Sequence, residues 1–223
     1  VDTVLEFDGD RHHGLRVLRA SKHRFGPTNE VGLLQMDGSG LTPVDDPSGL
    51  FLSDRVTGVS GSAIVATVDG NRPLLIEVQA LVAQSQLTNP RRSAQGIDQG
   101  RLAMLLAVIE RRCGIPVMAN DVYALAVGGV RVTDPGADAA LALAIVSSLT
   151  GQPLPDDLVA IGEVGLGGEL RHVGHLERRL TESARMGFRR AIVPKAATVD
   201  VPELEILRAP TLAAAMALAG FVD

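Results

Sequence analysis

The sequence predicts an α/β protein in which a β-rich segment precedes a domain of alternating helices and strands. Beyond residue 99, stretches with an apolar period of about 3.6 residues alternate with short β-branched runs, which is typical of α/β domains. Before residue 56, strand-like runs alternate with tight turns. Hydrophobic residues make up 46% of the 223 residues, which is enough to build a packed core.

The β-rich segment is predicted from two runs that have turn residues at both ends. Residues 14–20 and 30–36 are rich in β-forming side chains and are bounded by Gly, Pro, Asn and Asp. Residues 45–49 read Asp-Asp-Pro-Ser-Gly, which predicts a turn and a boundary soon after it. Strands at 62–68 and 73–82 are predicted to pair through the hairpin turn Asp69-Gly70-Asn71, and the polar residues 86–98 are predicted to form a loop.

Helices and strands alternate from residue 99 onward. A helix is predicted over 99–113, because Leu102, Leu105, Leu106 and Ile109 recur at helical spacing and Gly114 follows. The same kind of evidence predicts helices over 137–149, 175–186 and 212–219. Strands are predicted between them at 122–132, 158–164, 191–193 and 205–207.

Charge and cysteine content exclude several classes of protein. Lys and Arg number 21 against 26 Asp and Glu, so the net charge of −5 argues against a surface that coats nucleic acid throughout but permits a local basic patch. Cys113 is the only cysteine, which excludes an internal disulfide and a zinc site of several thiolates. No apolar run reaches membrane-spanning length and no secretory leader is visible, so we expect a soluble, cytoplasmic protein. Because the chain starts at Val1, we expect a fragment of a longer protein.

Motifs for common catalytic chemistry are missing from the sequence. The only lysines are Lys22 and Lys195, and neither follows a glycine, so the chain has no Gly-Lys-Ser/Thr phosphate-binding loop. The Gly-x-Ser-x-Gly pattern of many serine hydrolases is also absent. The histidines His12-His13 and the pair His172 and His175 lack the spacing of a metal site, so we predict no metal.

Two groups of basic residues are candidates for binding phosphate. Lys22 and Arg24 lie two residues apart on an extended segment and would project to the same side, where they could grip phosphate oxygens. The alternative is a solvated hairpin edge.

The second group lies between residues 91 and 112, where five arginines against Asp98 and Glu110 give a local charge of +3. The pair at 111–112 closes a helix, where the dipole favours cations, whereas Arg91, Arg92 and Arg101 have no such structural reason. Arg131 and Arg171 would extend the patch if the fold gathers them. With only 3% aromatic residues, contact with nucleic acid should be directed to the backbone and sensitive to salt.

Residues 22–30 carry a resemblance to a known family. They read Lys-His-Arg-Phe-Gly-Pro-Thr-Asn-Glu and resemble the Lys-Asn-Arg-Phe-Gly-x-Thr-Asn-Glu signature of the bacterial RadA (Sms) family of DNA-repair ATPases, with His23 in place of Asn. Other segments that resemble this family follow in the same order, at 9–13, 79–82, 89–92, 96–98, 128–131, 162–166 and 187–194. The resemblance therefore spans nearly the whole chain.

The resemblance implies a domain division and a function. Residues 1–56 would be the C-terminal end of a RecA-like ATPase domain, and residues 57–223 would form a Lon protease-like domain. The full-length protein would be a DNA-dependent ATPase that forms hexameric rings, promotes branch migration in recombination and works with the recombinase RecA. ATP and magnesium would bind to the full-length protein and zinc to an N-terminal finger outside this sequence, while this segment would hold no cofactor. Lys22 and Arg24 would act on the nucleotide of the neighbouring subunit.

The same resemblance tests for peptidase activity, because Lon proteases use a Ser–Lys dyad. Alignment on Leu149-Thr150-Gly151 places Gly136 where the nucleophilic serine should be, and alignment on residues 173–194 places Glu177 at the lysine. Neither residue can act as the nucleophile or the amine of such a dyad. We therefore expect an inactive Lon-like domain that binds DNA through Arg91, Arg92, Arg101, Arg131 and Arg171 and helps to assemble the ring.

Two alternatives remain open. The domain could be an oligomerisation scaffold without DNA contact, in which the arginines form salt bridges between subunits. It could also be a residual peptidase with an unforeseen nucleophile such as Ser147 or Ser148, although these serines lie in an apolar helix without a nearby lysine.

Overall fold

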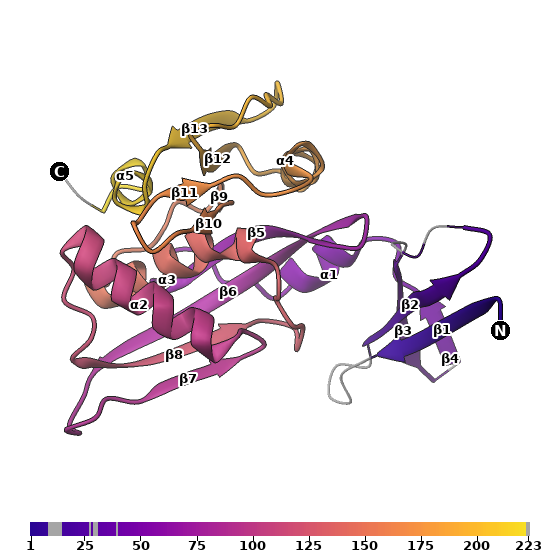
Figure 1. Cartoon of the computed structure of the whole chain (residues 1–223), viewed down its shortest axis with the longest axis horizontal. Helices are drawn as coiled ribbons and strands as arrows, with labels where there is room; N and C mark the ends of the chain where they lie inside the picture. Colours follow the sequence, from indigo (N-terminus) through magenta and orange to yellow (C-terminus); the bar gives the residue numbers. More distant parts are fainter. Residues whose placement is uncertain (9–14, 27, 29–30, 39, 222–223) are drawn as a thin grey trace.

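The computed structural model describes residues 1–8, 15–26, 28, 31–38 and 40–221. The N-terminal part forms a four-stranded antiparallel sheet at one end of the molecule (Figure 1). Its strands, in sheet order, are β1 (Thr3–Asp8), β2 (Leu15–His23), β3 (Val31–Asp37) and β4 (Gly40–Pro43). One face of this sheet turns Val17 and the buried Leu33 toward the main core, while Leu5 and Phe7 are exposed on the β1 strand.

The rest of the chain is built on a seven-stranded mixed sheet with the order β13-β12-β9-β5-β6-β8-β7. The centre is the antiparallel hairpin of β5 (Ser62–Asp69) and β6 (Arg72–Gln84), and β8 (Asn120–Ala126) pairs antiparallel with β6. The remaining strands pair in parallel: β7 (Arg92–Gln95) beside β8, and β9 (Leu158–Ala160), β12 (Arg190–Pro194) and β13 (Glu205–Ala209) on the other side. A small hairpin joins β10 (Glu163–Val164) to β11 (Leu170–Arg171).

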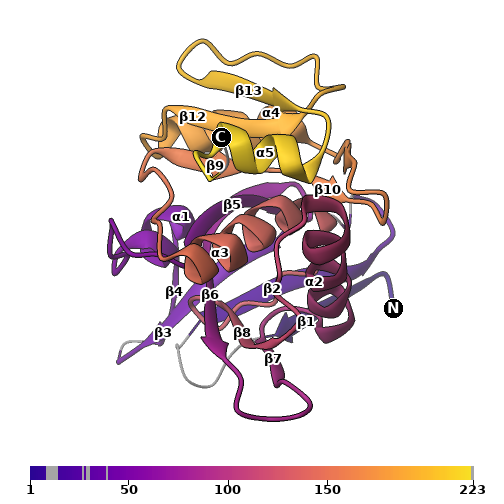
Figure 2. The same cartoon turned by 90° about the vertical axis from the view of Figure 1, so that its left-hand side faces the viewer.

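Helices cover both faces of the large sheet. The helices α2 (Gln99–Cys113), α3 (Asp138–Thr150) and α5 (Leu212–Leu218) lie on one face and share its larger apolar core (Figure 2). The helix α4 (Leu176–Arg185) covers the opposite face of β5, and the short α1 (Pro47–Leu52) links the small sheet to the large one (Figure 1). Ten of the thirteen α3 residues are buried, which makes α3 the central helix. The fold is α/β, as the sequence predicts.

The helix α2 has the predicted bounds because its start and stop signals are local. Asp98 caps the first turn, where its carboxylate accepts a hydrogen bond from the Arg101 N–H at 2.7 Å. Leu102, Leu105 and Leu106 are buried, and Gly114 ends the helix at a φ of +71°. No helix among the described residues is both long and apolar enough to span a lipid bilayer.

The structure differs from the sequence prediction in several places, and it contains three strands, β1, β4 and β11, that were not predicted. The expected turn at 45–49 leads into α1, because Asp46 accepts from the Gly49 N–H and Pro47 suits the first helical turn. The expected loop at 86–98 contains β7, a run of four residues that gives little strand signal and is ordered by pairing with β8. The predicted strand 122–132 ends at Ala126, since Gly128 and Gly129 adopt positive φ. The predicted strand 158–164 is divided into β9 and β10.

Gly96 offers a test of how tightly β7 is joined to the loop after β8. Its φ is +70°, and a Cβ at this position would lie 2.3 Å from the Val130 carbonyl oxygen. Gly96→Ala should therefore lower the free energy of unfolding by about 1–3 kcal/mol more than Gly114→Ala, as measured by urea denaturation. Gly114 is the matched control, because its φ is +71° and a Cβ there meets no heavy atom within 4 Å. Equal losses for the two variants would contradict this packing.

Candidate functional site

The turn before α3 is held by a buried ion pair between Asp134 and Arg179. The 3₁₀ turn Pro135–Ala137 follows Asp134, whose carboxylate accepts from the Gly136 N–H at 2.8 Å and from the Thr67 hydroxyl at 3.0 Å. Arg179 of α4 reaches the same carboxylate at 2.5 Å. Burial opposes ionisation of Asp134, but the Arg179 guanidinium and these donors outweigh it and lower the pKa of Asp134.

Arg179 packs against Gly136, the residue that the sequence predicts at the position of a nucleophile. A Cβ added at Gly136 would lie 3.1 Å from Arg179 Nη1, and the guanidinium also donates to the Ala66 carbonyl at 2.6 Å and to the Gly174 carbonyl at 2.9 Å. Glu177, two residues earlier on the same helix, is exposed to solvent. Of the two positions predicted for a Ser–Lys dyad, Gly136 is therefore buried beside a guanidinium, and Glu177 presents its carboxylate to solvent.

The start of α4 has an unusual backbone conformation. His175 is the N-cap of α4 and has a φ of +58°, which makes it the only non-glycine with positive φ among the described residues.

Arg101 has a structural partner that the sequence did not reveal. Its Nε donates to the carboxylate of Asp138 at 2.7 Å, its Nη2 makes a second contact there, and Glu163 lies 3.5 Å away. Asp138 is buried at the start of α3 and also accepts from the Val164 N–H at 2.9 Å. Burial raises the pKa of Asp138, and the Arg101 guanidinium partly offsets this effect. These groups line a cavity of about 340 Å³ beside the 3₁₀ turn.

The other predicted DNA-binding arginines differ in whether their guanidinium groups form hydrogen bonds or ion pairs within the chain. The Arg92 guanidinium donates to the carbonyls of residues 91, 118 and 120. Arg171 pairs with Glu169, with an Nε to Oε1 distance of 2.9 Å. The guanidinium groups of Arg91 and Arg131 make no hydrogen bond or ion pair with the described part of the chain, and both residues are exposed.

The structure does not gather these five arginines into one cluster. Arg91 and Arg92 lie at the start of β7, whereas Arg131 lies in the loop beyond the far end of β8, close to the Ile97–Val132 bridge. Arg101 lies in the first turn of α2, and Arg171 lies in β11 outside the large sheet. The cationic groups therefore form separate points on the surface.

Lys22 and Arg24 lie at the end of β2 and are both exposed. Arg24 pairs with Asp2 at 3.1 Å, and its guanidinium stacks 5.3 Å from the ring centroid of Phe25. The companion segment 9–13 with its two histidines lies outside the described residues, as do residues 27, 29 and 30 of the signature.

Other candidates for chemistry have structural explanations. Ser147 accepts from the Gly61 N–H at 2.9 Å and donates to the Gln152 carbonyl at 2.6 Å, and Ser148 accepts from the Val82 N–H at 2.9 Å. Burial raises the pKa of the half-buried Cys113 thiol. Within the described ranges, no three His, Cys, Asp or Glu side chains are grouped so that they could hold a metal ion.

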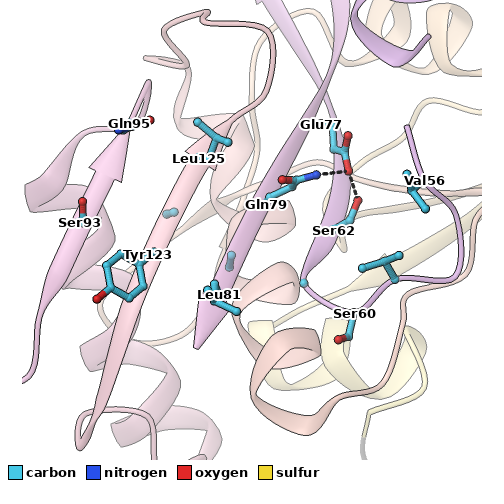
Figure 3. A pocket seen from close by; sticks show the side chains of 14 residues that line it. Val56, Ser60, Ser62, Glu77, Gln79, Leu81, Ser93, Gln95, Tyr123 and Leu125 are labelled. Atoms are coloured by element: carbon cyan, nitrogen blue, oxygen red, sulfur yellow. Dashed lines mark hydrogen bonds between the residues drawn. The ribbon is translucent and has the colours of Figure 1, made fainter. Parts of the chain in front are cut away.

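The sequence reasoning missed a groove on the open face of the large sheet. It has a volume of about 590 Å³, and its floor is formed by β5, β6 and β8 (Figure 3). Leu81, Tyr123 and Leu125 line it together with Glu77. Alternation along β6 and β8 was the available signal, because these residues alternate with the core residues Ala80 and Ala124.

Comparison with known proteins identifies two similarities. Residues 120–212 match the family model of the Lon protease (S16) C-terminal proteolytic domain. The chain is 48% identical over 216 residues to the DNA repair protein RadA of Mycolicibacterium smegmatis, covering 97% of this chain and 46% of the relative. It is 52% identical over 194 residues to RadA of Pseudomonas aeruginosa, covering 87% of this chain and 43% of the relative. The chain thus spans less than half the length of these relatives.

The ion pair of Arg101 gives a prediction for stability. Arg101→Ala leaves the Asp138 carboxylate buried without its cation, so the free energy of unfolding should fall by about 3 kcal/mol in urea denaturation. The control is Arg171→Ala, which removes an exposed pair and should change the stability by less than about 1 kcal/mol. A loss for Arg101→Ala no larger than that of the control would show that the pair does not stabilise the fold.

Proposed function

Since this chain belongs to the RadA family and corresponds to the C-terminal region of these DNA repair proteins, we propose that it serves DNA repair by binding DNA and assembling a ring. Residues 1–56 would be the end of a RecA-like ATPase domain and residues 57–223 a Lon-like domain. The Asp134–Arg179 pair beside Gly136 supports the proposal, because the turn at residues 134–137 holds this ion pair and contains neither serine nor lysine. We infer that the Lon-like fold serves binding in this chain, since one fold can host many unrelated functions.

The proposed DNA contact is electrostatic and made to phosphates. Arg91 and Arg131 carry it directly, since both side chains are exposed and neither guanidinium forms a hydrogen bond or ion pair with another described residue. Arg92 adds positive charge beside Arg91, whereas Arg101 and Arg171 form ion pairs with Asp138 and Glu169 and lie apart from it. Such contacts read the backbone of duplex or branched DNA and give little sequence specificity.

The proposed assembly is a homo-hexameric ring of a longer, cytoplasmic protein. The small sheet supports this, because Leu5, Phe7, Met36 and Leu41 are exposed on it and need a cover that the described residues do not supply. In the longer protein, an ATPase core would provide that cover and bind ATP and magnesium, and an N-terminal finger would hold zinc. Lys22 and Arg24 would reach the γ-phosphate on the neighbouring subunit, and the ring would drive branch migration together with the recombinase RecA.

One observation favours a second function, that of a scaffold without DNA contact. Several arginines of the large domain form ion pairs within the chain, among them Arg101, Arg179 and Arg190. Arginine is therefore used here as a structural cation, and the exposed arginines could serve the same purpose between subunits.

The first prediction concerns DNA affinity. Titration of a labelled 30-base-pair duplex between about 50 and 200 mM salt should show binding that weakens with salt, and Arg91→Glu or Arg131→Glu should each flatten the slope of log K against log salt by about 0.9. The matched control is Arg189→Glu, which makes the same charge change at an exposed arginine. Arg189 precedes β12, near the edge of the sheet opposite to β7. If both variants keep the wild-type slope of log K against log salt and their sedimentation coefficient changes, the result would favour a scaffold without DNA contact.

The second prediction concerns ATP. The purified chain should show no ATP turnover, because it has no Gly-Lys-Ser/Thr loop. In the longer protein, Arg24→Ala should lower kcat by about 10³-fold, since a cation acting in trans on the γ-phosphate contributes at least that much. Asp2→Ala, which removes only the exposed partner of Arg24, should change kcat by less than about twofold. Turnover by the chain alone, or full activity of Arg24→Ala, would refute the assignment.

A further inference from the structure

Helix α4 covers one part of a face of the large sheet, and the groove lies on the neighbouring part of the same face. Ile64 and Leu75 lie on this face beneath α4, and further along the same strands the face carries Ser62, Glu77 and Leu81. The residues that line this second part belong to strands β5 to β8 and to the loop at 56–61, and none of them lies in a helix. Leu81 is 62% exposed, and Val56 on the facing loop is 65% exposed. Exposed leucine and valine side chains gathered in a hollow mark a surface that another molecule covers.

The floor of the groove contains a carboxylate without a cation. Glu77 is only 3% exposed, and its Oε1 accepts from the Ser62 hydroxyl at 2.5 Å and from Gln79 Nε2 at 3.0 Å (Figure 3). Both donors are neutral, and Glu77 forms no ion pair with any described residue. A buried carboxylate is most stable with a cation beside it. The groove therefore suits an apolar side chain accompanied by a basic one.

The chain carries such a combination on the other face of the sheet. Leu166, at the tip of the turn between β10 and β11, is 69% exposed, and the turn is closed by a 2.9 Å hydrogen bond from the Gly168 N–H to the Gly165 carbonyl. Arg112 donates to the Leu166 carbonyl at 3.1 Å, and Arg111 is exposed beside it at the end of α2. Helix α2 packs on the opposite side of the sheet from the groove.

We propose that the Leu166 turn of one copy docks into the groove of the next copy. Leu166 enters the apolar part near Leu81, and Arg111 or Arg112 supplies the cation for Glu77. Because the two complementary surfaces lie on opposite sides of the sheet, the contact is head-to-tail, and repeating it generates a closed ring if the rotation closes. The inference rests on the proposed ring assembly and assigns its contact surfaces within the Lon-like domain. A symmetric contact between the grooves of two copies would instead place two concave surfaces and two Glu77 carboxylates against each other.

Disulfide cross-linking of mixed variants tests the contact. In a Cys113→Ala background, Leu81→Cys and Leu166→Cys are prepared separately, mixed and oxidised. Covalent dimers should form in the mixture and not in either variant alone, and a chain with both changes should give a ladder of covalent oligomers. Leu218→Cys is the control for Leu166→Cys, because it places a thiol at another exposed leucine on the α2 side, and it should not cross-link with Leu81→Cys.

Sedimentation of the same preparations separates the possible failures. Leu166→Asp should weaken self-association about 10- to 100-fold, and Leu218→Asp should not, because only the former loses a buried leucine at the contact. If the chain forms oligomers but Leu81→Cys and Leu166→Cys do not cross-link, this inference is overturned and the ring proposal still stands. A wild-type chain that stays monomeric at all concentrations, together with a longer protein that forms no ring, would overturn both. Covalent dimers of Leu81→Cys alone would replace the head-to-tail contact with a symmetric one.

Discussion

The buried pair of Asp134 and Arg179 is the interaction on which the arrangement of the large domain depends. It joins the turn before the central helix α3 to the α4 helix and, through Thr67 and Ala66, to strand β5. Removing either partner would leave the other charge in a site with little access to solvent, which costs far more than the pair itself contributes. The three elements are therefore fixed relative to one another.

Elements with local signals were predictable from the sequence, and elements held by distant contacts were not. Helix α2 combines a cap at Asp98, a helical apolar period and a terminal glycine, so its bounds agree with the prediction. Strand β7 has none of these features, because an edge strand of four residues with polar side chains derives its order from β8. Charges show the same limit. The sequence located Arg101 correctly in the first turn of a helix, but its partner Asp138 is 37 residues away and became visible only in the fold.

The division between engaged and exposed arginines changes how the basic residues are interpreted. In the sequence, the arginines between residues 91 and 112 look like one basic patch. In the structure, Arg91 and Arg92 lie at the start of β7, whereas the other three lie at the two ends of α2. Guanidinium groups that donate to backbone carbonyls, as in Arg92, organise a loop and keep their charge. Family membership, in contrast, followed from motifs that are scattered over the whole chain and was confirmed by relatives that are 43–52% identical.

The two edges of the large sheet have a consequence for association. Strand β7 is four residues long and follows Pro90, which has no N–H to offer a neighbouring strand, while the other edge strand β13 carries charged side chains at Glu205 and Arg208. Neither edge is a good template for adding a strand from another chain. A molecule with an exposed apolar groove is thereby protected from open-ended β-aggregation, and copies that gather at high local concentration remain separable, folded units.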